Sequence, residues 1–402
     1  MNRTVLISGA SIAGPALAYW LDRYGFQVTV VEKASAVRGG GYAVDVRGTA
    51  REVVDRMGLL PALRKAHVDS QKVTFVDPGG TPIATIRPEA MTGGAEGLDL
   101  EVRRGDLADA LYTPIRDRVE FLFDDSIARL DDRGDRVDVV FDSGVSRSFD
   151  LVIGADGLHS NTRRLVFGPE EQFHSYVGYA FAGFTLANDF GLSHEGVIWN
   201  VPGRAAVLYA HEPDEPLHGF LTFQQDEPPY EAFRDPIAQR DLVAAKFPYA
   251  GWYVPRLVEA VRSSDDLFFD VVSQIYMPTW SRGRVALAGD AAHATSFMSG
   301  QGSSVSLVGA YVLAGELATH DDHETAFAAY EHRIRDFVEQ NQALVDVGRR
   351  VVAPNTQELL DARDETLRAA GQSGERTGSD GTALSAEHSR SVHSGLVLPD
   401  YH

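Results

Sequence analysis

One short segment joins a glycine, an acid and the start of a helix in an order that suits cofactor binding. The apolar run Val285–Ala288 is followed at once by Gly289 and Asp290, and Gly300-Gln301-Gly302 then opens a long apolar helical pattern. The Asp290 carboxylate can accept from a ribityl or ribose hydroxyl, and free N–H groups at a helix start can hold an anion. The segment indicates a phosphorylated cofactor, although a strand–loop–helix turn with a capping acid explains it equally well in isolation.

The N-terminus carries a second segment suited to a nucleotide. The strand-like run Thr4–Ser8 is followed by a glycine-rich loop, an amphipathic helical pattern and a second strand that leads to Glu32. This order is the dinucleotide-binding fingerprint, in which glycines allow a tight turn and close helix packing, and the acid binds ribose hydroxyls. Ser11 replaces the usual middle glycine, and its hydroxyl can itself donate to phosphate. The expected contacts are Gly9, Ser11, Ile12, Ala13, Gly14, Glu32 and Lys33.

Three further segments could complete such a site. The three glycines after Arg38 lack side chains, so the backbone up to Gly41 can lie against a flat group, unless this is a plain surface turn. Arg104 ends a strand-like run before a helical pattern, where a solvated arginine is the alternative. The buried strand Phe149–Ile153 stops at Gly154-Ala155-Asp156-Gly157 before another helix. These segments predict additional cofactor contacts.

The elements that must position these residues alternate between strand and helix. Residues 1–77, 98–171 and 278–352 show this alternation and are expected to form one discontinuous nucleotide-binding domain. Residues 78–97 and 172–277 instead contain short aromatic-rich runs separated by turn residues, which predicts a substrate domain. The predicted fold is therefore α/β: a Rossmann-like lobe with an inserted, mostly antiparallel β-sheet lobe and C-terminal helices.

The C-terminal part of the chain divides into two segments. Residues 353–370 are predicted to form a helix. Residues 371–402 are rich in Gly, Ser, Thr and charge, which predicts a disordered tail.

The composition of the chain argues against several classes of protein. The 402 residues carry a formal net charge of -20, which argues against nucleic acid as a partner because phosphate binding needs a basic face. No apolar run approaches a membrane span, and no signal peptide is visible, so we expect a cytoplasmic protein. The absence of cysteine excludes disulfides, cysteine-based metal sites and flavin attachment through sulfur, and no other metal site is predicted.

The three glycine–acid motifs stand in an order that resembles a known family. Over roughly residues 1–350 the chain is similar to the single-component FAD-dependent monooxygenases of the para-hydroxybenzoate hydroxylase fold group. In length it resembles the compact aromatic hydroxylases and tetracycline-inactivating monooxygenases. The resemblance implies that the first motif and Glu32 bind the ADP part of FAD, that Asp290 binds the ribityl or pyrophosphate part, and that Asp156-Gly157 serves both FAD and the nicotinamide coenzyme. It adds Arg38, Gly41, Asp45, Arg104, Gly289, Gly300, Gln301 and Gly302 as cofactor contacts.

The resemblance also implies a reaction. NADPH or NADH reduces non-covalently bound FAD, O2 adds to give a C4a-hydroperoxyflavin, and oxygen passes to an aromatic or polyketide-like small molecule. Phe297 stands where the family commonly has a proline, beside the flavin ring. No protein acid or base is assigned. The predicted substrate pocket comprises Phe184, Tyr209, Phe223, Phe297 and Met298, for each of which an ordinary core position is the alternative.

Two other functions remain compatible with these motifs. One is a flavin-dependent dehydrogenase or oxidase that inserts no oxygen, and the other is a non-catalytic FAD-binding protein. Oxygen consumption with NAD(P)H separates them, because a dehydrogenase needs another electron acceptor and a binding protein shows no turnover.

Overall fold

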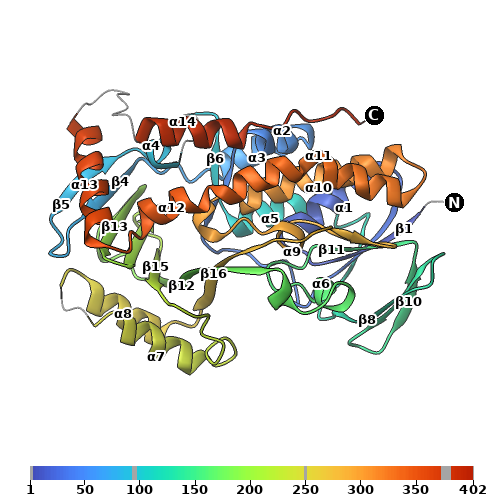
Figure 1. Cartoon of the computed structure of the whole chain (residues 1–402), viewed down its shortest axis with the longest axis horizontal. Coiled ribbons are helices and arrows are strands. Elements are labelled where there is room, and N and C mark those ends of the chain that lie inside the picture. The colour runs from blue at the N-terminus through green and yellow to red at the C-terminus, as the bar shows by residue number, and fades with distance from the viewer. Residues whose placement is uncertain (1–2, 93–96, 249–250, 373–381, 402) are drawn as a thin grey trace.

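The glycine-rich segments lie at strand ends of one six-stranded sheet. The computed structural model describes residues 3–92, 97–248, 251–372 and 382–401 (Figure 1). The strand order is β17-β18-β11-β1-β2-β7, and every neighbouring pair is parallel except β17 and β18. The strands are β1 Thr4–Ser8, β2 Gln27–Val31, β7 Glu120–Leu122, β11 Leu151–Gly154, β17 Ser281–Arg282 and β18 Val285–Leu287.

Both faces of this sheet are covered, which explains why its central strands are continuously apolar. Val5 and Ile7 pack with the long helices α1 (Ala13–Arg23) and α10 (Gly302–Thr319), whereas Leu6 faces a three-stranded antiparallel sheet. That small sheet has the order β10-β9-β8, with β8 Ile127–Asp132, β9 Val137–Phe141 and β10 Ser146–Phe149. The lobe matches the predicted Rossmann-like architecture.

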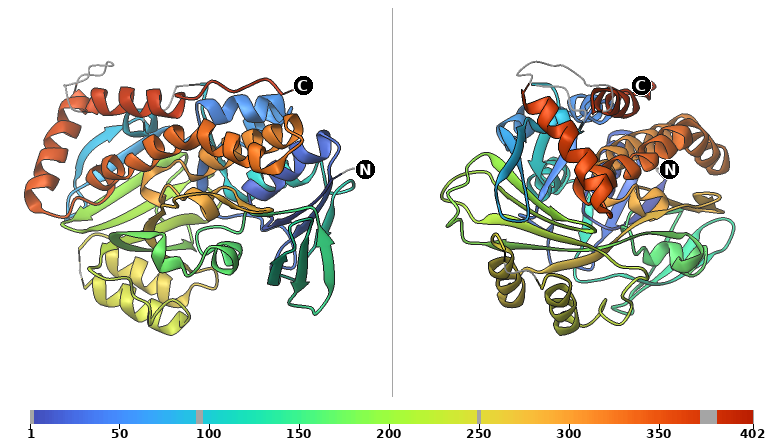
Figure 2. Two further views of the ribbon diagram at one scale, coloured as in Figure 1. Left: turned by 45° about the vertical axis from the view of Figure 1, so that its right-hand side comes forward. Right: turned by 60° about the vertical axis from the view of Figure 1, so that its left-hand side comes forward.

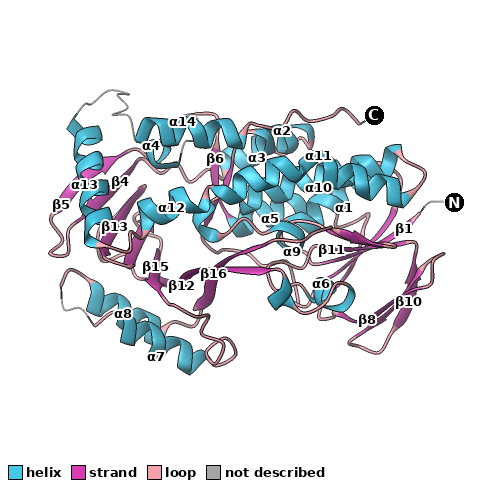
Figure 3. Cartoon of the chain, in the orientation of Figure 1, coloured by secondary structure: helices cyan, strands magenta, loops and turns pink. Residues whose placement is uncertain are grey.

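A seven-stranded sheet forms the second lobe, in the order β16-β12-β15-β14-β13-β4-β5 (Figure 3). Helices α7 (Pro236–Lys246) and α8 (Val254–Ser263) cover its outer face, and its inner face meets the first lobe and α12 (Val345–Val352) (Figure 2). The strands are β4 Lys72–Val76, β5 Pro82–Ile86, β12 His174–Leu186, β13 Glu195–Val201, β14 Arg204–Ala210, β15 Leu217–Gln224 and β16 Phe268–Ile275. Strand β4 therefore belongs to this sheet, whereas the predicted domain boundary at residue 78 assigned it to the first lobe.

The remaining elements connect the two lobes or cover them. Strands β3 and β6 form a short antiparallel pair between the lobes. Among the described residues, no helix has the length and apolarity needed to cross a bilayer. The elements are β3 Ala43–Val46, α2 Thr49–Arg56, α3 Leu60–Lys65, α4 Pro88–Thr92, β6 Leu100–Arg103, α5 Arg104–Tyr112, α6 Asn161–Val166, η1 Glu170–Gln172, α9 Asp290–His293, η2 Phe297–Ser299, α11 His323–Ala343, α13 Gln357–Gln372 and α14 Thr382–His393.

The end of the chain differs from the predicted disordered tail. Within residues 371–402 the structure describes α14, followed by an extended segment that packs on α2 and α10. Leu398 is buried in the core of the first lobe, and Tyr311 Oη donates to the Pro399 carbonyl at 2.7 Å. Tyr401 Oη donates to Glu316 Oε1 at 2.6 Å. The segment is mostly polar, so its composition did not predict that a few of its residues pack on the first lobe. The residues that they contact are far away in the sequence.

We expect Tyr401→Ala to lower the free energy of unfolding by about 2 kcal/mol, from lost ring packing and a lost hydrogen bond to a buried carboxylate. The ring lies against Gly315, where a Cβ would be only 2.0 Å from it. Urea denaturation should show a smaller loss for Tyr401→Phe, which keeps the ring. Equal stability of all three proteins would mean that the C-terminal segment is not docked in solution.

Candidate active site

The glycine-rich loop after β1 is packed too closely for side chains at two positions. Gly9 has φ +106°, and a Cβ there would lie 2.4 Å from the Ala155 carbonyl oxygen. A Cβ on Gly14 would lie 1.9 Å from the Gly9 carbonyl oxygen. The start of α1, with Ile12 and Ala13, is therefore held directly against the strand ends. This geometry presents the helix N-terminus as an anion site.

Glu32 lies beside this loop at the end of β2. Its Oε2 accepts from the Ala10 amide at 2.8 Å, and its Oε1 accepts from the Ala34 amide at 2.9 Å. The two bonds fix the carboxylate, and each oxygen keeps a second acceptor position for a ribose hydroxyl. Lys33, the next residue and also a predicted contact, is exposed.

Arg104 is brought to the same loop from a distant part of the chain. Its Nη1 donates to Ser11 Oγ at 3.0 Å, so the serine that replaces the middle glycine has a cationic partner. A Cβ on Gly41 would lie 3.7 Å from Arg104 Nε. A guanidinium beside a helix N-terminus suits a pyrophosphate. Arg38 lies exposed in the preceding loop.

Asp156, one of the predicted cofactor contacts, is held by hydrogen bonds within the chain. Its carboxylate accepts from Ser8 Oγ at 3.3 Å, from Ser160 Oγ at 2.5 Å, and from the Thr162 amide and Oγ1 at 2.9 and 2.8 Å. Three of these bonds end on Oδ2 and one on Oδ1, and together they tie the end of β1 to the start of α6. Gly157, with φ +84°, faces open space. Asp156 therefore positions the strand ends.

Arg163 is a structural residue of the site that sequence reasoning missed. Its side chain is fully buried, donating from Nη1 to the Ala291 carbonyl at 3.0 Å and from Nη2 to the Leu158 carbonyl at 2.7 Å. Nη2 also forms an ion pair with Glu170 at 2.6 Å. The arginine thus joins the Asp156 and Asp290 segments. No pattern in the sequence distinguishes Arg163 from the exposed Arg164 that follows it.

The Asp290 segment packs against the start of α1 and presents a second carboxylate to the site. Gly289 has φ +60°, and a Cβ there would lie 2.8 Å from Ala13 Cβ, so the segment packs against α1. Among the described residues, the Asp290 carboxylate has no hydrogen-bond partner, and burial raises its pKa to about 6. Gly302, at the start of α10, would place a Cβ 3.7 Å from Asp290 Oδ1. The buried Gln301 Oε1 also lacks a partner within the described chain.

We expect FAD affinity to rise with pH through about 6, because the ionised Asp290 accepts a hydroxyl hydrogen bond more strongly than the protonated acid does. The raised pKa has the opposite effect on the apoprotein: the folded state holds a proton that the unfolded chain has lost, so its stability falls as pH rises from about 4 to 6. Asp290→Asn should remove both dependences, and Asp290→Ala should weaken FAD binding by about 1.5–3 kcal/mol. Fluorescence titration of apoprotein with FAD measures this. An identical pH profile in Asp290→Asn would contradict the assignment.

Asp45 approaches the same region from strand β3. Its Oδ1 forms an ion pair with Arg47 Nη2 at 2.5 Å. Its Oδ2 lies 3.7 Å from the position of a Cβ on Gly300, whose φ is +68°. Burial is the main cause that raises the pKa of Asp45. The structure therefore brings Asp45 beside the Gly300–Gly302 loop.

An aromatic wall joins this region to the inner face of the seven-stranded sheet. Phe297 stacks on Phe181 with ring centroids 4.5 Å apart and an interplanar angle of 10°. Phe220 lies 5.4 Å and Tyr42 lies 6.4 Å from the Phe297 ring, measured between centroids. Met298 is buried in the same cluster. These rings connect the inner face of the sheet to the segment that follows Asp290.

Two of the predicted pocket residues lie elsewhere. Phe184 and Phe223 point to the outer face of the sheet, where they pack under α7 and α8 with Phe247. Tyr209 is on the inner face, and its hydroxyl accepts from the Ala43 amide at 2.9 Å. We therefore replace Phe184 and Phe223 by Phe181 and Phe220 in the candidate pocket.

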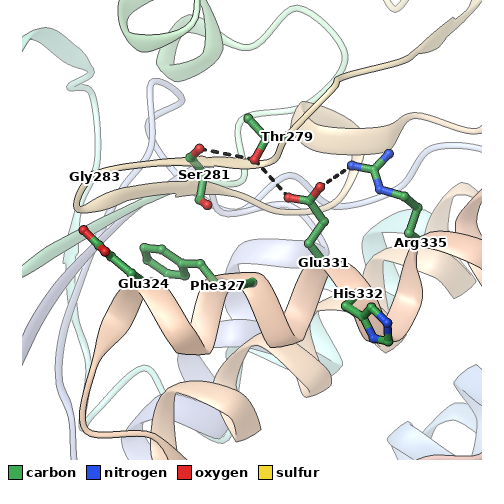
Figure 4. A pocket seen from close by; sticks show the side chains of 9 residues that line it. Thr279, Ser281, Gly283, Glu324, Phe327, Glu331, His332 and Arg335 are labelled. Atoms are coloured by element: carbon green, nitrogen blue, oxygen red, sulfur yellow. Dashed lines mark hydrogen bonds and ion pairs between the residues drawn. The ribbon is translucent and has the colours of Figure 1, made fainter.

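A surface pocket between β17 and α11 is separate from this site (Figure 4). Glu331 accepts there from Thr279 Oγ1 at 3.1 Å and from the Trp280 amide at 2.9 Å, and it pairs with Arg335 at 2.5 Å. The Glu331 carboxylate therefore joins α11 to the segment before β17. We interpret the pocket as a structural feature. Among the described residues, no group of three or more His, Cys, Asp or Glu side chains could hold a metal ion.

The open carboxylate of Asp290, the Arg104 guanidinium and the close-packed glycines fit FAD. Residues 265–344 match the family model of an FAD binding domain. The chain is 39% identical over 343 residues to a flavin-dependent monooxygenase of an unidentified prokaryote, covering 85% of this chain and 88% of the relative. It is 34% identical over 343 residues to a flavin-dependent monooxygenase of Legionella longbeachae, covering 85% and 87%. The crystal structure of the tetracycline destructase Tet(55) superposes with a TM-score of 0.85 at 34% identity, covering 100% of this chain and 99% of that one. The protein belongs to the FAD-dependent monooxygenases of the para-hydroxybenzoate hydroxylase fold group.

Proposed function

We propose that this monooxygenase uses NADPH or NADH and O2 to oxygenate a flat aromatic or polyketide-like small molecule. One observation carries the proposal: Phe297 follows the Asp290 segment in the chain and stacks on Phe181 of the seven-stranded sheet. The substrate site is therefore the boundary between the cofactor segments and the inner face of that sheet. Aromatic walls bind flat apolar molecules by stacking and by burial of area. The expected cytoplasmic location is part of the same proposal.

The chain's own residues have positioning tasks in this reaction. Arg104 and the start of α1 would hold the pyrophosphate, Glu32 a ribose hydroxyl, and Asp290 a ribityl hydroxyl. When bound, FAD supplies the electron transfer from the coenzyme and the activation of O2. The aromatic wall excludes water from the reacting atoms. Burial raises the pKa of Tyr42 and of Tyr209, so both hydroxyls remain protonated and neither acts as a base.

The similarity to solved structures supports the substrate class. Tet(51), another tetracycline destructase, superposes with a TM-score of 0.83 at 30% identity over all of both chains. Because Tet(55) and Tet(51) are named for a flat polycyclic molecule, a substrate of that shape is our first choice.

Turnover with isotopically heavy O2 tests the proposal. The flavin-loaded protein is incubated with NADPH and either tetracycline or 1,8-dihydroxyanthraquinone, and products are examined by mass spectrometry. We expect a product that contains heavy oxygen, with NADPH oxidation accelerated by the substrate. Recovery of all consumed O2 as hydrogen peroxide would favour an oxidase, a need for another electron acceptor would favour a dehydrogenase, and absence of flavin reduction would favour a binding protein.

A further inference from the structure

The segment between α9 and η2 contains a backbone conformation that residues with a side chain rarely adopt. Ser296 has φ +88° and ψ 146°, a combination found almost exclusively at glycine. The residue is 9% exposed, and Phe297 follows it directly. A strained residue of this kind costs free energy and persists only where its surroundings fix the backbone around it. The neighbours of Ser296 must therefore hold this segment in place.

Two buried glutamines bind the peptide carbonyls that precede Ser296. Gln274 of β16 donates from Nε2 to the Thr295 carbonyl at 3.0 Å, and Gln342 of α11 donates from Nε2 to the Ala294 carbonyl at 3.2 Å. The two residues are also joined directly, because Gln274 Nε2 donates to the Gln342 carbonyl at 2.7 Å. Their exposures are 4% and 2%. Loss of either side-chain amide would remove a donor from a buried carbonyl, which costs free energy.

The backbone after Ser296 is held as well. Ser299 Oγ donates to the Ser296 carbonyl at 2.8 Å, and Ser296 Oγ accepts from the Met298 amide at 3.2 Å. Helix α12 lies directly against this turn, since a Cβ on Gly348 would be 1.8 Å from the Met298 carbonyl oxygen. Together with the two carbonyls bound by the glutamines, three consecutive carbonyls accept from side chains. The Phe297 ring belongs to this fixed segment.

We propose that Gln274 and Gln342 are positioning residues for oxygen transfer: they hold the strained backbone at Ser296 and thereby place the Phe297 ring on Phe181. This inference rests on the proposed function, in which the aromatic wall excludes water from the reacting atoms. Both glutamines act through the carbonyls that they bind. A change in either should therefore alter how much of the oxidised NADPH yields product and how much yields hydrogen peroxide.

The absence of cysteine from the chain permits a direct measurement of this segment. Met298→Cys introduces a single thiol at a position that is 6% exposed, and its rate of reaction with an aromatic disulfide reagent reports local opening. In the flavin-loaded protein without coenzyme, Gln274→Met or Gln342→Met should raise this rate about tenfold, because methionine has a similar shape but no donor. Ser296→Gly, added to Gln274→Met, should lower the rate again, since glycine adopts this backbone without a steric cost. A rate that stays high would contradict the role of strain.

Val139→Cys, made in a chain that keeps Met298, is the control for global unfolding. Val139 is buried in β9 of the small sheet. Its thiol should react at the same rate with and without Gln274→Met. Equal acceleration at both positions would assign the glutamines to general stability and overturn the inference. Absence of acceleration at Met298→Cys would overturn it too, because the segment would then hold itself.

Asn341→Leu is the matched control for the loss of a buried amide. Asn341 precedes Gln342 in α11, is fully buried, and donates from Nδ2 to the Phe337 carbonyl of its own helix at 2.8 Å. This variant should change neither the thiol reaction at Met298→Cys nor the yield of product for each NADPH oxidised.

Turnover in chains that keep Met298 completes the test. We expect Gln274→Met to retain its flavin, to oxidise NADPH and to release severalfold more hydrogen peroxide than the native protein. Faster thiol reaction with an unchanged product yield would overturn the positioning role. Faster thiol reaction in a protein that oxygenates neither tetracycline nor 1,8-dihydroxyanthraquinone would contradict the proposed function, and the hold of the two glutamines on the segment would stand.

Discussion

Gly14→Ala should produce a protein that purifies without FAD and is destabilised by about 3 kcal/mol or more. The new Cβ would lie 1.9 Å from the Gly9 carbonyl oxygen and 3.0 Å from the Gly9 carbonyl carbon. Both atoms belong to the backbone of the residue directly after β1, so no side chain can rotate away. Helix α1 must move off β1, and its N-terminus then no longer points at the pyrophosphate position. Flavin absorbance per chain and the melting temperature measure the two effects.

Gly196→Ala is the control for a glycine without this close approach. Gly196 lies in β13, where the nearest atoms to a new Cβ are 3.6–3.8 Å away, which is ordinary contact. We expect full flavin content and a stability change below about 1 kcal/mol. A Gly14→Ala protein with normal flavin content would show that the loop can relax and that the close packing does not position the cofactor.

Phe297→Ala should uncouple coenzyme oxidation from product formation. Removal of the ring that stacks on Phe181 opens the wall and admits water beside the reacting atoms. NADPH oxidation should persist while product falls severalfold and hydrogen peroxide rises by the same amount. Because Phe297 is only partly buried, the loss of stability should stay below the roughly 3–5 kcal/mol typical of a fully buried phenylalanine. Peroxide yield and melting temperature should be measured on one preparation.

Phe223→Leu separates this effect from plain core packing. Phe223 is fully buried on the outer face of the same sheet, against Phe247. The variant should lose about 1 kcal/mol of stability and keep normal coupling. If Phe297→Ala lost stability but retained coupling, Phe297 would be a core residue and the pocket would lie elsewhere.

The sequence by itself determined the features that depend on local order along the chain. The Gly9–Gly14 segment that joins β1 to the first turn of α1, Glu32 at the end of β2, and the Gly289-Asp290 turn before α10 all lie where their patterns predicted them. Each is set by strand and helix periodicity and by residues close in sequence. The order of these motifs was sufficient to predict the family.

Only the tertiary structure decided which side chains meet. Phe181 and Phe184 are equally aromatic, but they are three residues apart in one strand and so lie on opposite faces of it. Which face is inner depends on where the first lobe and the two outer helices pack, and composition does not encode this. Asp156 resembles Asp290 in sequence, yet Ser160 and Thr162 donate hydrogen bonds to its carboxylate, whereas that of Asp290 has no partner among the described residues. The docked C-terminal segment was missed for the same reason: the free energy of such contacts comes from partners distant in the chain, which become neighbours only when the fold is complete.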